Sequence, residues 1–218
     1  MAQFVVIGLG RFGFAACLEL KRLGNKVIGV DSRERVVNQV VEHIDYATSL
    51  DATDETALRQ LDITRSKAVL VAIGENLEAS ILCVLSLKNL GVEQIWVKAS
   101  SEAHHTILSR LGVTRVIHPE EEMGIKVAQA LNYPMVNQYM QLGHGFYMVE
   151  VIVNKLSCGQ SLATLLKRAK GEIKAVLVQR GKTCYTNPAE TFLINEDDKV
   201  ILNGQLKALN SIALKLEA

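Results

Sequence analysis

The sequence predicts an α/β fold, a doubly wound parallel sheet, followed by a small α+β lobe. Short apolar segments alternate with amphipathic ones over residues 1–117, which is typical of parallel strands joined by helical crossovers. A glycine-rich turn joins the first of these strands to the first helix. Around Asn132-Tyr133-Pro134 the sequence changes to short β-like segments. We therefore expect two domains, at residues 1–133 and 134–218.

The glycine-rich turn predicts how the chain begins. Residues 4–7 are apolar and β-branched, as in a buried parallel strand. Gly8, Gly10 and Gly13 follow as G-x-G-x-x-G. In this spacing the first glycine permits a tight turn, the second lets a pyrophosphate approach the backbone, and the third lets the helix pack closely on the strand. The helix is expected to end near Gly24.

A second strand, residues 26–30, ends at Asp31. A carboxylate there accepts hydrogen bonds from both hydroxyls of an adenosine ribose and repels a 2′-phosphate. The turn and the acid together predict a Rossmann-like site for an adenine nucleotide. Arg11, inside the turn, suits a terminal polyphosphate better than the pyrophosphate of NAD. The alternative for Arg11 is a solvated cation on the first helical turn.

Further strands are expected at residues 46–49, 68–72, 94–97 and 115–117, and further helices at 33–41, 55–61, 77–90 and 102–111. The expected strand order is 3-2-1-4-5-6, which brings the carboxyl ends of the strands to the ligand. The candidate contact residues at these ends are Asp31, Asp51, Ala52, Ile73, Gly74, Glu75, Lys98, Ala99 and Ser100.

The helix at residues 77–90 has almost no polar face. A surface helix normally shows a single apolar stripe, so we expect this one to be buried on more than one side. A subunit interface is favoured, because a sheet of this size does not enclose a helix; the alternative is a helix deep within one domain.

Two features near the end of the first domain leave alternatives open. The helix that begins at His118-Pro119-Glu120 has proline and acids in its first turn, which suits the helix dipole. A chemical role for Glu120 would need a cation. His104 is expected either to reach the nucleotide, since its helix follows Lys98, or to lie on the surface.

Composition excludes several classes. The net charge is +1 with dispersed charges, so no nucleic-acid partner is expected. The most apolar region, residues 68–87, is interrupted by polar residues and does not predict a membrane span. The first strand begins too early for a signal peptide. The four cysteines are far apart and predict reduced core residues of a cytoplasmic protein, with no disulfide or metal framework.

The second domain is expected to hold strands at residues 146–153, 173–179 and 199–202, and helices at 162–168 and 205–216. It shows no Ser/His/Asp set, no cysteine with a base and no metal-ligand spacing. A regulatory lobe fits this better than a substrate domain.

Both halves together resemble the RCK family, the cytosolic gating subunits of bacterial Ktr/Trk-type potassium uptake systems. The resemblance rests on VIGLGRFG at 6–13, VAIGENLEASIL at 71–82, IWVKA at 95–99 and VIHPEEEMGIKVAQAL at 116–131. In the second half, GQSL at 159–162 and EDDKVILNG at 196–204 are similar more loosely.

The resemblance implies a role for each candidate residue. The turn amides, that of Phe12 included, and Arg11 would bind phosphates, and Asp31 with the adjoining Ser32 would bind the ribose. Asp51 and Ala52 would border the adenine. The rest of the pocket would be formed by Ile73, Gly74, Glu75, Lys98, Ala99, Ser100 and His104. Glu75 departs from the family pattern, and its side chain is expected to turn away.

The resemblance also implies ATP or ADP as ligand, with NAD or NADH as the alternative. Glu120 would hold a cation, Mg²⁺, Ca²⁺ or Na⁺, at a dimer interface. Dimers would build an octameric ring beneath an integral-membrane potassium-translocating subunit, at the inner face of the membrane. Some relatives bind cyclic di-AMP in the small lobe, and the sequence leaves that ligand open.

Two other classes are weighed against this one. An NAD-dependent dehydrogenase would need a proton-relay residue and a substrate domain, and neither is visible. A redox-sensing repressor would need a pair of DNA-binding helices, and none fits before the first strand or in the β-rich second half.

Overall fold

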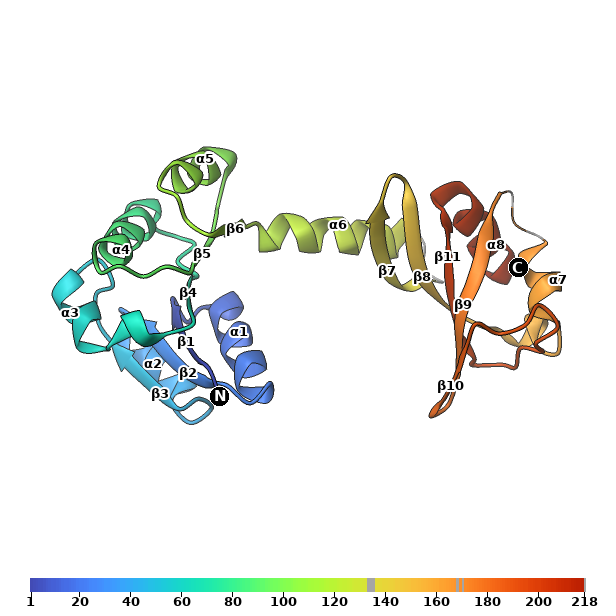
Figure 1. Cartoon of the computed structure of the whole chain (residues 1–218), viewed down its shortest axis with the longest axis horizontal. Coiled ribbons are helices and arrows are strands. Elements are labelled where there is room, and N and C mark those ends of the chain that lie inside the picture. Colours follow the sequence, from blue (N-terminus) through green and yellow to red (C-terminus); the bar gives the residue numbers. More distant parts are fainter. Residues whose placement is uncertain (133–135, 168, 170, 218) are drawn as a thin grey trace. The chain divides into compact units, whose positions relative to one another are not determined.

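The computed structural model of the chain describes residues 1–132, 136–167, 169 and 171–217. It divides into two compact units, Met1–Glu121 and Glu122–Ala218, so the division falls within one helix (Figure 1). The expected boundary between residues 133 and 134 lies outside the described residues and stays a prediction. Each unit is described below by itself.

The first unit contains a six-stranded parallel sheet in the order β3-β2-β1-β4-β5-β6. This confirms the predicted fold class and strand order. The strands are β1 (Gln3–Ile7), β2 (Lys26–Asp31), β3 (Tyr46–Ser49), β4 (Ala68–Val71), β5 (Ile95–Lys98) and β6 (Arg115–Ile117).

The helices differ from prediction by one or two residues at their ends. They are α1 (Arg11–Arg22), α2 (Glu34–Val40), α3 (Glu55–Gln60), α4 (Leu77–Asn89), α5 (Glu102–Arg110) and α6 (Pro119–Asn132). A short 3₁₀ turn, Ile63–Arg65, was not predicted. Its preceding residue, Asp62, has a φ of +54° and so reverses the chain after α3.

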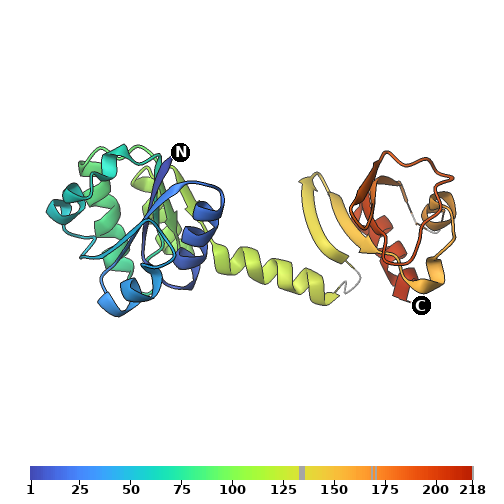
Figure 2. The same cartoon turned by 90° about the horizontal axis from the view of Figure 1, so that it is seen from below.

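Helices cover both faces of this sheet, as the two views of the ribbon show (Figures 1 and 2). The cause is visible in β1, whose successive side chains alternate between two clusters. Val5 and Ile7 belong to a cluster with residues of α3, α4 and α5, whereas Val6 packs with Cys17 of α1 and Val37 of α2. The sheet is therefore buried on both sides, which is typical of a parallel sheet.

One face of α4 belongs to this core, with Cys83, Val84 and Leu87 fully buried. The opposite face leaves Leu82 and Leu85 about two-fifths exposed, at 41% and 39%. The first unit alone therefore does not enclose the helix, and the interpretation as a helix deep within one domain is wrong. The subunit interface stays a prediction.

The second unit contains a five-stranded antiparallel sheet in the order β10-β9-β11-β8-β7. The strands are β7 (Val136–Gly143), β8 (Phe146–Ile152), β9 (Ile173–Arg180), β10 (Thr183–Thr186) and β11 (Lys199–Gln205). Two helices, α7 (Leu162–Leu166) and α8 (Leu206–Glu217), and a 3₁₀ turn, Lys155–Ser157, accompany it. The expected end of the first helix, residue 168, lies outside the described residues.

An ion pair with a buried carboxylate joins the last residue of β9, Arg180, to Asp198, which precedes β11. Asp198 is 1% exposed and accepts two hydrogen bonds of 2.9 and 2.8 Å from the Arg180 guanidinium. It also accepts one from the amide of Asn195. Burial alone would raise the pKa of Asp198, but these bonds outweigh it and lower the pKa.

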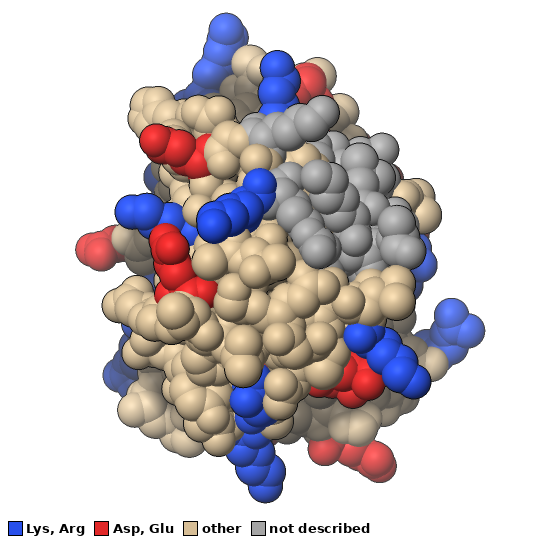
Figure 3. Space-filling view, turned by 90° about the vertical axis from the view of Figure 1, so that its right-hand side faces the viewer, with Lys and Arg blue, Asp and Glu red and all other residues tan. Residues whose placement is uncertain are grey.

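On the face shown in Figure 3, charged side chains of both signs are dispersed among uncharged ones.

The cysteines are divided between core and surface. Burial raises the pKa of the Cys17 and Cys83 thiols to about 12, which keeps both protonated and unreactive. Cys158 and Cys184 are exposed, so their expected core position is wrong. All four are free thiols. Among the described residues, no helix is both long and apolar enough to cross a membrane.

Replacing Gly13 by alanine should destabilise the first unit by about 3 kcal/mol or more, because backbone must move to admit the methyl group. A Cβ at Gly13 would lie 1.9 Å from the carbonyl oxygen of Gly8. A Cβ at Gly10 would meet nothing within 4 Å, so Gly10→Ala is the matched control and should cost about 1 kcal/mol or less.

The chain has one tryptophan, Trp96, and it lies on β5 in the first unit. Its fluorescence during urea denaturation therefore reports the unfolding of that unit. If Gly13→Ala does not fold at all while Gly10→Ala does, the destabilisation at Gly13 is larger than expected and the prediction is still confirmed. Equal stability of the two variants would contradict the close packing of α1 on β1.

Candidate functional site

The glycine turn presents the first turn of α1 at the carboxyl edge of the sheet, the edge at which its six strands end. Gly8 adopts a φ of +94°, and its amide donates to the carbonyl of Val30 over 2.7 Å. Gly10 is the N-cap and contributes no side-chain bond, and the first turn of α1 holds no acid. The unpaired amides and the helix dipole therefore favour an anion here.

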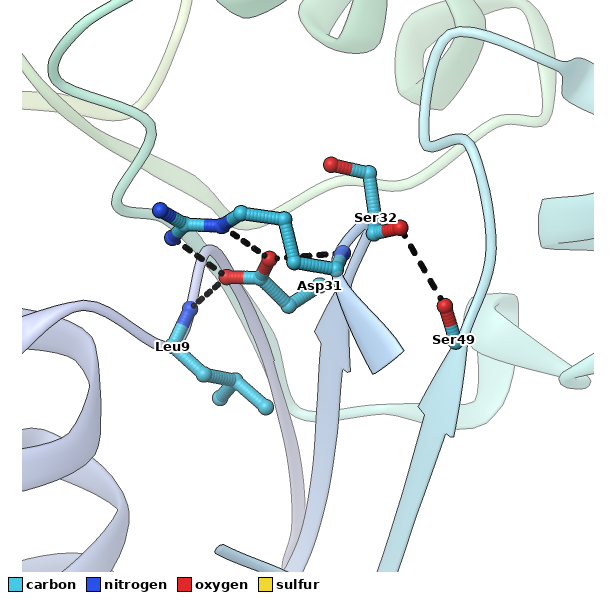
Figure 4. Close-up of polar contacts among 5 residues, drawn as sticks. Leu9, Asp31, Ser32 and Ser49 are labelled. Carbon is cyan, nitrogen blue, oxygen red and sulfur yellow. Dashed lines mark hydrogen bonds and ion pairs between the residues drawn. The ribbon is translucent and has the colours of Figure 1, made fainter. Parts of the chain in front are cut away.

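Asp31 lies at the end of β2, 5% exposed, beside the glycine turn. One carboxylate oxygen, Oδ2, accepts from the Leu9 amide over 2.8 Å, and the other, Oδ1, accepts from the Arg33 amide over 3.0 Å (Figure 4). The Arg33 guanidinium also donates to both oxygens, over 3.0 Å and 3.2 Å. Burial alone would raise the pKa of Asp31, but these bonds outweigh it and lower the pKa.

The sequence interpretation did not name Arg33 among the site residues. The Arg33 side chain is 58% exposed, yet its guanidinium covers the buried carboxylate of Asp31. A basic residue two positions after the acid that ends the second strand was the available signal, because an arginine near this point is known to alter ribose recognition.

Ser32, Asp51 and Ala52 lie where β2 and β3 end. The carbonyl of Ser32 accepts a hydrogen bond of 3.3 Å from the hydroxyl of Ser49 (Figure 4). Asp51 accepts from both the amide and the hydroxyl of Thr53, at 2.9 and 2.8 Å, and these bonds lower its pKa. Ala52 is buried. Asp51 therefore shapes the loop, and its Oδ1 is already engaged.

A second cluster joins the ends of β4 and β5 to the beginnings of α1 and α6. Lys98, whose side chain is 13% exposed, forms an ion pair with the exposed Glu120. Its Nζ lies so close to Gly74 that a Cβ there would be 3.0 Å away. The hydrogen bond from Lys98 lowers the pKa of Glu120, and the charge of Arg11 contributes to this. Four of the predicted residues are therefore close together.

The other predicted site residues that follow β4 and β5 differ in their exposure to solvent. Ile73 and Gly74 are half-buried and Ala99 is buried, whereas Ser100 is exposed. Glu75 is exposed, and its charge helps to raise the pKa of Arg33, after the larger effects of Asp31. Phe12, in the turn, is half-buried.

His104 is 1% exposed, so the expectation of a surface histidine is wrong. Its Nδ1 accepts from the amide of Ser100 over 3.3 Å, which leaves the proton on Nε2. Nε2 is buried and has no hydrogen-bond partner among the described residues. Burial, and then the charge of His118, lower the pKa of His104 and favour its neutral form.

The neighbouring His105 pairs with His118, with 2.8 Å between Nδ1 and Nε2 and stacked rings. Within the part of the chain that the structure describes, no three His, Cys, Asp or Glu side chains form a group that could hold a metal ion. Glu120 is engaged by Lys98. A cation at Glu120 would therefore need ligands from outside this set, such as phosphate oxygens or a second chain.

Comparison with known proteins follows the same division of the chain. Residues 4–119 match the family described as the TrkA-N domain. Over 205 residues the chain is 38% identical to the Ktr system potassium uptake protein A of Bacillus subtilis (strain 168), covering 94% of this chain and 92% of that protein. The protein of the same name in Vibrio alginolyticus is 33% identical over 202 residues, 93% of this chain and 92% of its own.

Solved structures share the fold at lower identity. The GsuK RCK domain matches 99% of this chain with a TM-score of 0.56 and 20% identity. The GsuK channel bound to NAD matches 100% of it with a TM-score of 0.57 and 20% identity. This chain spans 46% and 39% of those two chains. These structures show the fold alone. The family match and the curated relatives confirm the resemblance noted from the motifs: the chain belongs to the TrkA-N family, with the Ktr system potassium uptake proteins.

Proposed function

We propose that this protein is a cytoplasmic regulatory subunit that controls potassium uptake through a membrane-embedded, potassium-translocating partner. The observation that carries the proposal is the 38% identity to a named potassium uptake protein over 94% of the chain. The described residues add a carboxyl edge equipped for a nucleotide, with an anion-binding helix start and a ribose-type carboxylate. The protein acts as a switch and catalyses no reaction.

The ligand we propose is ATP or ADP. Arg11 and Lys98 both lie near Glu120 beside the glycine turn, so two cations are available where terminal phosphates would lie. The second candidate is NAD or NADH, which is favoured by the fold shared with a channel that binds NAD. Titration of one preparation with ATP, ADP and NADH separates the two candidates.

The proposed assembly is a ring of dimers, eight chains in all, at the inner face of the membrane. Leu77, Leu82 and Leu85 on the outer face of α4 are each about two-fifths exposed, which is unusual for neighbouring leucines on one helix. A second copy of the chain would cover them.

ATP and ADP would act differently because a ligand shifts a conformational equilibrium only by its difference in affinity for the two states. The γ-phosphate is where the two nucleotides differ. Lys98 is paired with Glu120 in this structure, with Arg11 near the same carboxylate. A γ-phosphate would compete with Glu120 for these cations, and a bound cation would then replace Lys98 beside Glu120.

Arg11→Ala should weaken ATP binding more than ADP binding, by about ten-fold against about two-fold, because a guanidinium forks onto terminal phosphate oxygens. Isothermal titration calorimetry measures both affinities. Arg22→Ala removes the same charge at the opposite end of α1 and should change neither. Equal losses for the two nucleotides would return Arg11 to the role of a solvated cation.

Glu120→Gln should abolish any enhancement of ATP binding by Mg²⁺, Ca²⁺ or Na⁺, because a neutral amide no longer attracts the ion beside the phosphates. Glu122→Gln, two residues further along α6, is the matched control and should keep the enhancement. Titrations of ATP with and without each ion give the result. If none of the ions strengthens ATP binding to the parent protein, the cation site is wrong.

The proposed control of potassium uptake is tested by measuring potassium flux into liposomes that carry the purified membrane subunit. Addition of this protein should make the flux depend on the nucleotide, with ATP and ADP differing by about five-fold or more if the coupling is about 1–3 kcal/mol. Liposomes without the protein are the control. Identical flux with both nucleotides, or steady turnover of NADH with a small substrate, would overturn the proposed function.

A further inference from the structure

Arg33 has a contact that neither the motif nor the proposed switch explains. Its guanidinium lies against both carboxylate oxygens of Asp31, with Nε 3.0 Å from Oδ1 and Nη2 3.2 Å from Oδ2. The Asp31 side chain is 4% exposed and that of Arg33 is 58% exposed. A largely solvated side chain therefore covers a buried acceptor.

The hydrogen-bonding capacity of Asp31 is filled in this arrangement. A carboxylate offers about two acceptor positions on each oxygen. The amide of Leu9 takes one position on Oδ2, and the amide of Arg33 takes one on Oδ1. The guanidinium takes a second position on each oxygen. A ribose diol donates two O–H bonds and needs these same outer positions, so the guanidinium and the diol exclude each other.

We propose that Arg33 competes with the ribose for this site: its guanidinium caps the ribose-binding carboxylate of Asp31 until a ribose diol displaces it. The inference rests on the proposed nucleotide function and adds to it. Ligands with both ribose hydroxyls gain two bonds for the two that they displace. Ligands without the two hydroxyls leave the Arg33 guanidinium on Asp31 and gain no hydrogen bond from this carboxylate.

The competition is tested by calorimetric titration with ADP and with 2′,3′-dideoxy-ADP. Arg33→Ala opens the carboxylate, so ADP should bind about two- to five-fold more tightly, the range expected for removing one ion pair whose cation is exposed to solvent. Binding of 2′,3′-dideoxy-ADP should not change, because that ligand does not compete with the cap. Arg35→Ala removes the same charge from an exposed position two residues along and should leave both affinities unchanged.

A loss of ADP affinity in Arg33→Ala would overturn the cap, because it would mean that the guanidinium contacts the bound ligand. Binding of ADP to the parent with no gain in Arg33→Ala would also overturn it, and would leave the proposed nucleotide function intact. Failure of the parent to bind ATP, ADP or NADH would overturn both proposals.

Discussion

The candidate site depends on one close contact, between Gly13 of α1 and the carbonyl of Gly8 at the end of β1. A Cβ at Gly13 would lie 1.9 Å from that oxygen, so only glycine allows the helix to begin this near the strand. The contact fixes the turn between the two glycines. The Leu9 amide then points at Asp31, and Arg11 begins α1 near Glu120. Backbone packing therefore sets where the Leu9 amide and Arg11 meet the two charged clusters.

Each cluster is neutralised by an ion pair within the chain. At the β2 end of the carboxyl edge Arg33 pairs with Asp31, and at the β5 end Lys98 pairs with Glu120. In both pairs one partner is buried or nearly so, and the other is exposed. An unpaired charge costs more free energy when it is buried than when it is solvated. The less exposed member of each pair therefore depends more strongly on having a partner. The exposed partner, which keeps contact with water, is the one that moves at low cost.

Much of this could be predicted from the sequence, because local signals agreed with the fold. The alternation of apolar strands and helices predicted the order 3-2-1-4-5-6, and the G-x-G-x-x-G turn placed Asp31 beside α1. β10 was missed because its four residues, Thr183–Thr186, are all exposed and carry no alternating apolar pattern. The surface alternative for His104 was wrong because the polarity of an imidazole does not show that its Nδ1 turns back to Ser100. The Arg33 contact depends on side-chain geometry that no spacing encodes.

Internal pairing makes ligand binding an exchange of partners. When a ribose or a phosphate takes the place of a guanidinium or a carboxylate, most hydrogen bonds are replaced, so the net change in free energy is the small difference between two similar sets. Small differences suit a switch, because two ligands that share the same ribose then differ only where their phosphates differ. In this chain the ribose pair, Asp31 with Arg33, would set how tightly a ribose diol is bound. The phosphate pair, Lys98 with Glu120, would set which conformation the nucleotides favour.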